Sequence, residues 1–275
     1  MYRVDIFKSI VIYVLIGLTL VICVFPYFWL IETAFKTRVD AFAVPPVWIF
    51  KPTLAHFQEA FLNKGFSLYF MNSLIIAGLS TLIVMVFALP AAYAFSRFKM
   101  FASEHLFFYT LVSYMAPPII FCLPLYLLFS KFHAIDTLQA IILGHTEFNL
   151  GYAIWLMRGF FEDVPRELDK AALVDGCTQF EAFYHVILPV AMPGIVVTCL
   201  FCFISSWNEF LYALTLTGHT SRTLPVAILG LVTPLGTNWG QIASVSVVIT
   251  APVCIITFLL QRYIVRGLTL GAVKG

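Results

Sequence analysis

The sequence predicts an all-α polytopic membrane protein that forms one transmembrane domain over residues 1–275. Only 11% of its residues are charged, whereas a soluble domain carries about 25%. Several apolar runs reach the roughly 20 residues that an α-helix needs to cross the hydrocarbon core of a bilayer. The mean hydropathy of +0.95 agrees with this composition. A net charge of +2 gives no reason to expect nucleic acid as a partner.

Six apolar stretches are expected to form transmembrane helices, so membrane lipid is an expected partner. They lie at about residues 8–34, 68–95, 105–130, 137–160, 186–215 and 240–264. The first is too long for a signal-peptide core and is followed by no small-residue cleavage site, so we expect a retained span. The loop of residues 36–67 is expected to be periplasmic. Within it, TLAHFQEAF predicts a short amphipathic helix with Thr53 as its cap.

The basic residues predict which side of the membrane each loop occupies. With six spans, both termini lie on the same side. Placing that side in the cytoplasm leaves ten Lys and Arg residues inside and six outside, so both termini are expected to be cytoplasmic. The inner set is Arg3, Lys8, Arg97, Lys99, Arg158, Arg166, Lys170, Arg262, Arg266 and Lys274, and the outer set is Lys36, Arg38, Lys51, Lys64, Lys131 and Arg222.

The six cysteines do not indicate a metal or redox centre. Cys199 and Cys202 form a C-x-x-C motif, but this spacing inside an apolar run favours packing, in which a thiol behaves as a small hydrophobe. The sequence has no second C-x-x-C and no H-x-H that would complete a zinc site. We therefore expect no bound metal.

Prolines interrupt several of the predicted spans. They are Pro90, Pro117, Pro118, Pro124 and Pro252. Each removes a helix hydrogen bond and permits a kink. This pattern is compatible with ordinary bundle packing and with a bundle that bends in order to open.

The charged stretch PRELDKAALVDGCTQF, residues 165–180, predicts two short helices on the cytoplasmic surface. Asp163 is expected to cap the first helix, and Gly176 to end it, because glycine readily adopts the left-handed C-terminal conformation. Thr178 and Glu181 match a capping box for the second helix. The acidic residues argue against a helix that lies on lipid headgroups, so we expect a protein partner. The face expected to point outward comprises Leu168, Ala171, Ala172 and Leu173.

The run ELDKAALVDG, followed by Phe183 and by Ile187-Leu-Pro189, closely resembles the EAA loop of binding-protein-dependent ABC importer permeases. Asp169-Lys170 stands where that family often has two acidic residues. The segments PAAYAFSRF (90–98) and SSWNEFLYAL (205–214) resemble the carbohydrate branch, called CUT1. The ending QRYIVRGLTLGAVKG resembles the MalG-like permeases of that branch. The resemblance covers nearly the whole chain.

The resemblance implies the fold of a type I ABC importer transmembrane domain, with a cytoplasmic coupling helix between spans four and five, in residues 163–185. That helix is implied to fit a cleft in the ATPase subunit. The residues assigned to this contact are Glu167, Asp169, Ala171, Ala172, Asp175, Gly176, Phe183 and Pro189. The cytoplasmic tail, residues 265–275, is implied to reach the ATPase dimer through Gly271, Lys274 and Gly275.

The resemblance also implies a location and a set of partners. The location is the bacterial cytoplasmic, or inner, membrane. The partners are two ATPase subunits, a second and homologous permease subunit, a periplasmic or lipid-anchored solute-binding protein, and a sugar-like solute.

The chain itself contains no G-x-x-x-x-G-K-[ST] motif, which would cradle nucleotide phosphates. We therefore expect a non-catalytic subunit that binds no cofactor, with ATP and Mg held by the partner ATPase. Closure of the ATPase dimer would move the docked loop and switch the bundle between inward-open and outward-open states.

A few polar residues inside the predicted spans are expected either to line the solute pathway or to join helices. A charge at bilayer depth is costly and usually faces protein or a water-filled path. Aromatic, amide and carboxylate groups together suit a sugar-like solute, and they suit interhelical hydrogen bonds equally well. The set is Trp207, Asn208, Glu209, Tyr212, Glu147 and Asn149. The nearby His145 is expected to be structural.

The main alternative is a secondary transporter or channel for a polar solute. It would explain the kinked spans and the intramembrane carboxylates, but not the docking helix. An intramembrane protease is disfavoured, because the weak match of Gly78-Leu-Ser-Thr81 to G-x-S-x lacks a histidine in the last span.

Overall fold

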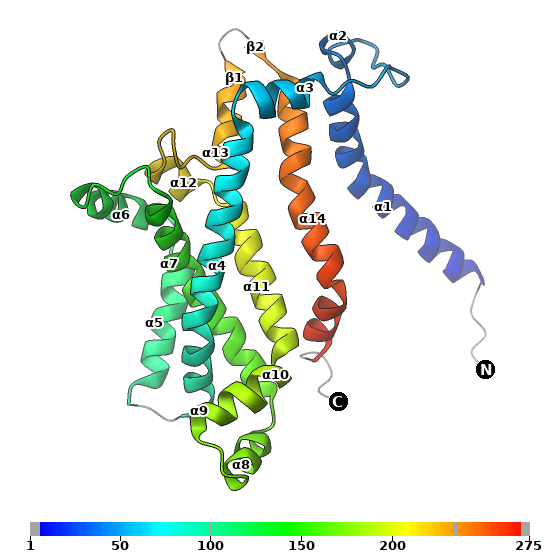
Figure 1. Ribbon diagram of the computed structural model, residues 1–275. Helices are drawn as coiled ribbons and strands as arrows, with labels where there is room; N and C mark the ends of the chain where they lie inside the picture. Colours follow the sequence, from blue (N-terminus) through cyan, green and yellow to red (C-terminus); the bar gives the residue numbers. More distant parts are fainter. Residues whose placement is uncertain (1–5, 99–100, 234–235, 271–275) are drawn as a thin grey trace. The chain divides into compact units, whose positions relative to one another are not determined.

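The computed structural model describes residues 6–98, 101–233 and 236–270, and these form two compact units (Figure 1). Unit 1 comprises residues 1–67 and 228–251, and unit 2 comprises residues 68–227 and 252–275. The regular secondary structure of the described residues is helical, apart from one short antiparallel pair of strands, β1 (Val232–Thr233) and β2 (Gly236–Thr237). The all-α prediction is therefore confirmed.

Unit 1 contains one long helix, several short ones and the beginnings of two more. Its helices are α1 (Ile6–Phe35), α2 (Arg38–Ala41), α3 (Ala55–Gln58), the π-helix η1 (Glu59–Asn63), η3 (Ile228–Leu231) and the first part of α14 (Trp239–Leu270). The predicted amphipathic helix is present as α3 and η1, and Thr53 Oγ1 accepts from Ala55 N at 3.1 Å. Lys64 Nζ donates to Gln241 Oε1 at 2.8 Å and so ties η1 to the start of α14.

Unit 1 also buries one ion pair. Lys36 Nζ lies 3.0 Å from Glu32 Oε1, and both side chains are buried. The ammonium group lies 5.0 Å from the centre of the Trp29 ring and 5.3 Å from that of Phe50. Aromatic faces attract a cation, so they compensate part of the desolvation cost of this charge.

Unit 2 contains a bundle in which α4, α5, α7 and α11 run alongside one another (Figure 1). Its helices are α4 (Phe66–Arg97, which begins in unit 1), α5 (Ser103–Met115), α6 (Ile119–Lys131), α7 (Leu138–Asp163), α8 (Arg166–Val174), α9 (Gln179–Ala182), the π-helix η2 (Phe183–Ile187), α10 (Leu188–Val190), α11 (Met192–Trp207), α12 (Leu211–Leu216) and α13 (Leu224–Ala227). Glycine lets α7 lie close to α5: a Cβ at Gly151 of α7 would strike the carbonyl oxygen of Thr110 in α5.

Two predicted spans are not continuous helices. The third span, expected at 105–130, is broken between α5 and α6, and the two halves differ in direction by 94°. Ala116 is extended there, because the residue before a proline is pushed out of the helical region, and Pro117 follows it. The fifth span, expected at 186–215, bends by 77° between α10 and α11 and ends at Trp207, with α12 as a separate helix.

By length and apolar composition, three described helices could cross a membrane: Lys8–Phe35, Phe66–Arg97 and Trp239–Tyr263. The α5–α6 pair and the α9–α11 segment could each add one broken span. The helix α7 is 26 residues long and carries several charges, and it is not in this set. The count of six spans therefore stays a prediction.

A single carboxylate holds two loops of unit 2 together. Asp136, between α6 and α7, accepts hydrogen bonds from the backbone N–H groups of residues 218–221 at 2.7–3.1 Å. The Ser221 hydroxyl donates to the same carboxylate at 2.8 Å. Burial acts to raise the pKa of Asp136, but the hydrogen bonds from Ser221 and Thr220 lower that pKa more, so it lies well below its ordinary value.

Candidate coupling loop and polar cluster of unit 2

The candidate coupling loop, residues 163–185, has the two short helices that the sequence predicts. Helix α8 ends at Val174, with Asp175 as its C-cap, and Gly176 follows with a φ of +90°. Only glycine adopts this conformation readily, because it has no Cβ. Thr178 and Glu181 form the predicted capping box at the start of α9. The hydrogen bonds from the backbone and hydroxyl of Thr178 lower the pKa of Glu181.

The prediction that Asp163 caps the first helix is wrong. Asp163 is the last residue of α7, and α8 begins at Arg166 with Pro165 in the N-cap position. Val164 and Pro165 are extended, so the chain changes direction between the two helices without a side-chain cap. A proline here costs nothing in hydrogen bonding, since the first N–H groups of a helix have no intrahelical partner.

Helix α8 has an inner face and an outer face. Ala172 is buried and Leu168 packs against the core, so the prediction that these two residues point outward is wrong. The outer face carries Glu167, Lys170 and Ala171, all of them exposed. The alanine pair is therefore divided: one alanine lets α8 lie close to its own bundle, and the other is free to meet a partner.

Asp169 also points inward. Its Oδ1 accepts a hydrogen bond from the Tyr93 hydroxyl at 2.6 Å, and its Oδ2 lies 2.9 Å from Arg97 Nε. Arg97 in turn donates from Nη2 to the carbonyl oxygen of Val164 at 2.8 Å. We call Tyr93, Arg97 and Asp169 the Asp169 clamp. It joins α8 to the end of α4.

Phe183, predicted to contact the ATPase, is buried inside the same region. Its ring centre lies 4.7 Å from that of Tyr93 and 6.2 Å from that of Phe161. Burial of an aromatic ring in such a cluster stabilises the fold. Phe183 therefore holds the loop in place, whereas Pro189 is exposed in the adjoining α10.

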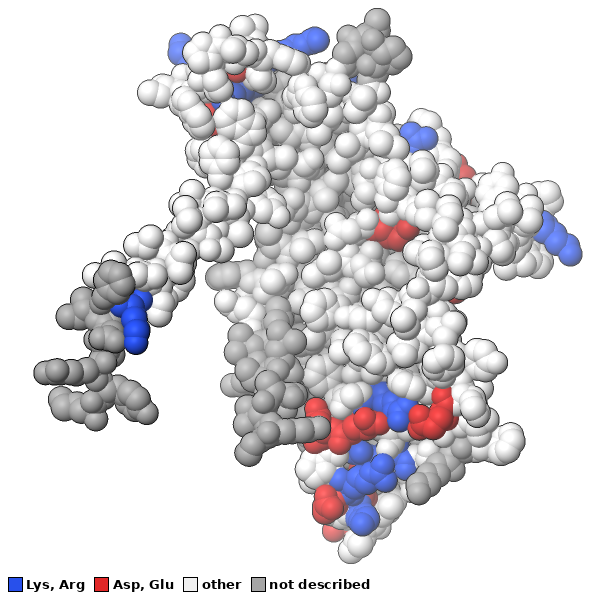
Figure 2. All heavy atoms as spheres, turned by 180° about the vertical axis from the view of Figure 1, so that it is seen from behind, with Lys and Arg blue, Asp and Glu red and all other residues white. Residues whose placement is uncertain are grey.

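The exposed surface of the loop is both charged and apolar. Figure 2 shows charged side chains gathered at the lower end of unit 2, over α8 and its neighbours. The same loop also exposes large apolar side chains: Val174 is 87% exposed, Phe180 74% and Tyr184 58%. Sequence reasoning missed these three residues. The capping box was the available signal, because it places Phe180 in the first turn of a surface helix.

Of the predicted pathway residues, Glu209, Tyr212 and Glu147 meet at the corner between α11 and α12, whereas Asn149 donates to the Cys202 carbonyl within α11 at 3.5 Å. Glu209 Oε1 accepts from the backbone N–H groups of Leu211 at 2.7 Å and Tyr212 at 2.8 Å. Its Oε2 accepts from Ala213 N at 3.1 Å and lies 3.2 Å from His145 Nε2. Glu209 therefore caps α12, where the positive end of the helix dipole favours a carboxylate.

The corner is linked to two further helices. The buried His145 of α7 makes a 2.6 Å hydrogen bond from Nδ1 with Ser206 Oγ, and this hydroxyl lies 3.0 Å from Ser80 Oγ of α4. The Tyr212 hydroxyl donates to Glu147 Oε2 at 3.0 Å. The geometry supports the structural role expected for His145, because its ring joins α7 to α11 and to the Glu209 carboxylate.

The six predicted pathway residues differ in exposure. Trp207, Tyr212 and Asn149 are buried, and the Glu209 side chain is 10% exposed. Asn208 is exposed and Glu147 is partly exposed. Of these six residues, Asn208 and Glu147 are the most accessible to a solute in this conformation. For most of the others, hydrogen bonds between helices explain the buried polar groups.

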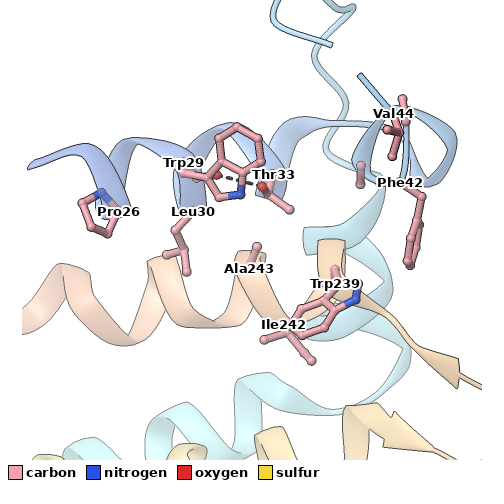
Figure 3. A pocket seen from close by; sticks show the side chains of 11 residues that line it. Pro26, Trp29, Leu30, Thr33, Phe42, Val44, Trp239, Ile242 and Ala243 are labelled. Atoms are coloured by element: carbon pink, nitrogen blue, oxygen red, sulfur yellow. Dashed lines mark hydrogen bonds between the residues drawn. The ribbon is translucent and has the colours of Figure 1, made fainter. Parts of the chain in front are cut away.

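The cavity shown in Figure 3 belongs to unit 1 and does not suit a sugar. It has a volume of about 520 Å³ and lies between α1, the segment around α2, and α14. Its lining is mostly apolar, with Trp29, Leu30, Trp239 and Ile242 among the lining residues. The hydroxyl of Thr33, its polar side chain, already donates to the Trp29 carbonyl at 2.8 Å.

The remaining predicted residues, Gly271, Lys274 and Gly275, lie outside the described residues. Among the residues that are described, no cluster of three His, Cys, Asp or Glu side chains could hold a metal ion.

Over residues 85–270 the sequence matches the family described as binding-protein-dependent transport system inner membrane component. The chain belongs to this family. The probable ABC transporter permease protein y4oR of Sinorhizobium fredii is 40% identical, covering 91% of this chain and 90% of that protein. The diacetylchitobiose uptake system permease protein DasC of Streptomyces coelicolor is 35% identical, covering 92% of both chains. The trehalose/maltose transport system permease protein MalG of Thermococcus litoralis is 33% identical and covers 99% of both.

The fold is shared with a chain of the crystal structure of a bacterial ABC transporter that imports the polysaccharide alginate. The TM-score is 0.77 at 21% sequence identity, and the match covers 96% of this permease and 98% of that chain. This permease is therefore a multi-pass inner membrane subunit of an ABC importer, without catalytic activity of its own, and it works with ATPase and binding-protein partners. Its relatives fit the predicted carbohydrate branch.

Proposed function

We propose that this permease imports a sugar or sugar-like solute and is driven by a separate ATPase that docks on the coupling loop. The single observation that carries the coupling part is the construction of α8. Its inner face is fixed to the bundle through Asp169 and Ala172, while its outer face presents Glu167, Lys170 and Ala171 at the end of unit 2.

The outer surface of the loop supports this assignment by its chemistry. Val174, Phe180 and Tyr184 expose large apolar area, and aromatic residues are enriched where protein partners meet. Glu167, Lys170 and Asp175, in the same loop, are exposed charges of both signs. Exposed charges of both signs together with large exposed apolar side chains favour a protein interface, whereas helices on a lipid surface favour Lys and Arg.

The partners follow from the same proposal. We assign two ATPase subunits, which bind ATP and Mg, and a second, homologous permease subunit, while this chain binds no cofactor. A periplasmic or lipid-anchored binding protein delivers the solute. Both termini lie in the cytoplasm with the coupling loop, and residues 36–67 lie outside. The tail residues Gly271, Lys274 and Gly275 are proposed to reach the ATPase dimer.

The solute class rests on the relatives named for diacetylchitobiose and for trehalose/maltose transport. Asn208 and Glu147 supply accessible amide and carboxylate oxygens at the α11–α12 corner, and such groups hydrogen-bond the hydroxyls of a carbohydrate. In the conformation described here, these two residues are the pathway candidates that this chain contributes.

Co-purification through a tag on this chain tests the proposal. We expect an ATPase subunit, a second permease and MgATP hydrolysis in the eluate. In proteoliposomes, the complex should take up radiolabelled diacetylchitobiose, trehalose or maltose only when MgATP and the binding protein are supplied. The Ala171→Arg variant of the same complex tests the docking face: it should release the ATPase while this chain remains in the membrane. Solute uptake by the purified chain alone would contradict the proposal and favour a secondary transporter.

A further inference from the structure

Several side-chain contacts attach the coupling loop to the last turns of α4, a helix far from it in the sequence. Asp169 binds Tyr93 and Arg97, as described above. In addition, Arg166 Nη2 donates to the Ser96 carbonyl at 2.9 Å. Helix α8 is thus held at three points along one short stretch of α4.

Burial makes the central ion pair resistant to separation. The Arg97 side chain is 6% exposed and that of Asp169 is 16% exposed. Moving α8 away from α4 would leave each charge poorly hydrated and without its partner, which is strongly unfavourable. The pair between Arg158 and Glu104 differs, since the Glu104 side chain is 76% exposed and water can replace its partner.

The apolar contacts of Tyr93 extend the attachment to two more elements. Its ring centre lies 5.8 Å from that of Phe161 in α7 and 4.7 Å from that of Phe183 in η2. One side chain of α4 therefore touches α7, α8 and η2 together. Close-packed groups of this kind move as a unit, because the interior deforms little.

We propose that the Asp169 clamp makes α4 move as one body with the coupling loop, so that α4 carries the displacement of the loop across the membrane. In this scheme Asp169 is a positioning residue that does not itself touch the ATPase. The inference rests on the proposed function, since it concerns how motion received from an ATPase reaches the bundle.

The test replaces the ion pair with a covalent link that can be reversed. In a Cys177→Ser background, Arg97→Cys and Asp169→Cys are combined and joined by a bis-methanethiosulfonate linker of about the length of an arginine side chain. The complete ABC complex is reconstituted in proteoliposomes. Uptake of radiolabelled diacetylchitobiose, trehalose or maltose, whichever the unmodified complex transports, is measured per ATP hydrolysed.

We expect the unlinked double variant to assemble and hydrolyse ATP, with uptake per ATP reduced about fivefold or more. The linker should restore uptake to near the unmodified value, and a reductant should abolish it again. Full coupling without the linker would overturn the proposal. So would a linked complex that hydrolyses ATP without transport, because α8 would then have to move relative to α4.

A milder variant covers the case in which the double variant fails to fold. Tyr93→Phe removes only the hydroxyl that binds Asp169, and Tyr109→Phe, at a 69% exposed position of α5, is its matched control. Tyr93→Phe should lower uptake per ATP and Tyr109→Phe should not, and equal coupling in the two would overturn the proposal. Failure of the proposed function would look different, since the unmodified complex would then show no ATP-dependent uptake.

Discussion

Glu209→Gln distinguishes a structural carboxylate from a solute ligand at the corner between α11 and α12. Glu209 accepts three backbone hydrogen bonds at the start of α12 and pairs with His145, and its side chain is 10% exposed. Glutamine keeps the shape and one acceptor oxygen, but it loses the charge and the second acceptor. A hydrogen bond to a charged group contributes about 1.5–3 kcal/mol. Because glutamine keeps one acceptor oxygen and loses the other, we expect a loss of about 2–3 kcal/mol in folding stability.

The assay is thermal unfolding of the purified complex in detergent, read as a melting temperature because a membrane complex need not unfold in two states. Glu147→Gln is the matched control, since Glu147 accepts a hydrogen bond from the Tyr212 hydroxyl and is partly exposed. Glu209→Gln should lower the melting temperature by several degrees more than the control, while the surviving complex transports normally. A variant with unchanged melting temperature and lost sugar uptake would refute this reasoning and assign Glu209 to the solute.

Three further predictions concern the loops. Asp136→Asn should lower the melting temperature at pH 7 more than Asp40→Asn does, because the partly exposed Asp40 carboxylate accepts a hydrogen bond from the Thr37 hydroxyl, whereas five hydrogen bonds hold Asp136. The extra loss in melting temperature should vanish only as the pH falls below about 4, because the folded-state pKa of Asp136 lies below the ordinary carboxyl value. The same extra loss at every pH would contradict this prediction. Gly176→Ala should destabilise the loop by about 1–2 kcal/mol, since its φ of +90° strains any residue with a Cβ, and faster limited proteolysis of the loop would show it. Ala171→Arg should spare folding and block ATPase binding, whereas Ala172→Arg should reduce the amount of folded permease, because Ala172 is 5% exposed; equal yields would contradict this.

The elements of this fold could be predicted from local signals. Long apolar runs predict α1, α4 and α14, and the capping box at Thr178 predicts the start of α9. These signals are short-range, since each depends on residues within a few turns of one another. The break at Pro117 was visible as a proline pair, but its 94° bend was not, because the angle depends on what the two halves pack against.

The polar cluster was found by sequence but interpreted only in part. A carboxylate inside an apolar run indicates that a partner exists, and it does not say whether the partner is a solute, a side chain or a backbone. For Glu209 the partners are mostly the N–H groups two to four residues ahead. To predict these backbone partners of Glu209, one would first have had to predict a separate helix that starts at Leu211 instead of a continuous fifth span.

Asp169 shows where prediction by periodicity could have gone further. Leu168, Asp169 and Ala172 follow Pro165 at spacings of three, four and seven residues, which is the pattern of a buried stripe on a helix. That pattern indicates that Asp169 points inward, against the usual expectation that an acidic residue in an alanine-rich helix is a surface residue. It also requires a buried cation as partner. Arg97, the basic residue at the end of α4, meets that requirement only once the fold brings α4 to α8. Under the proposed coupling role, an inward acid has a physical purpose: it lets α8 present a surface to the ATPase while remaining attached to the bundle.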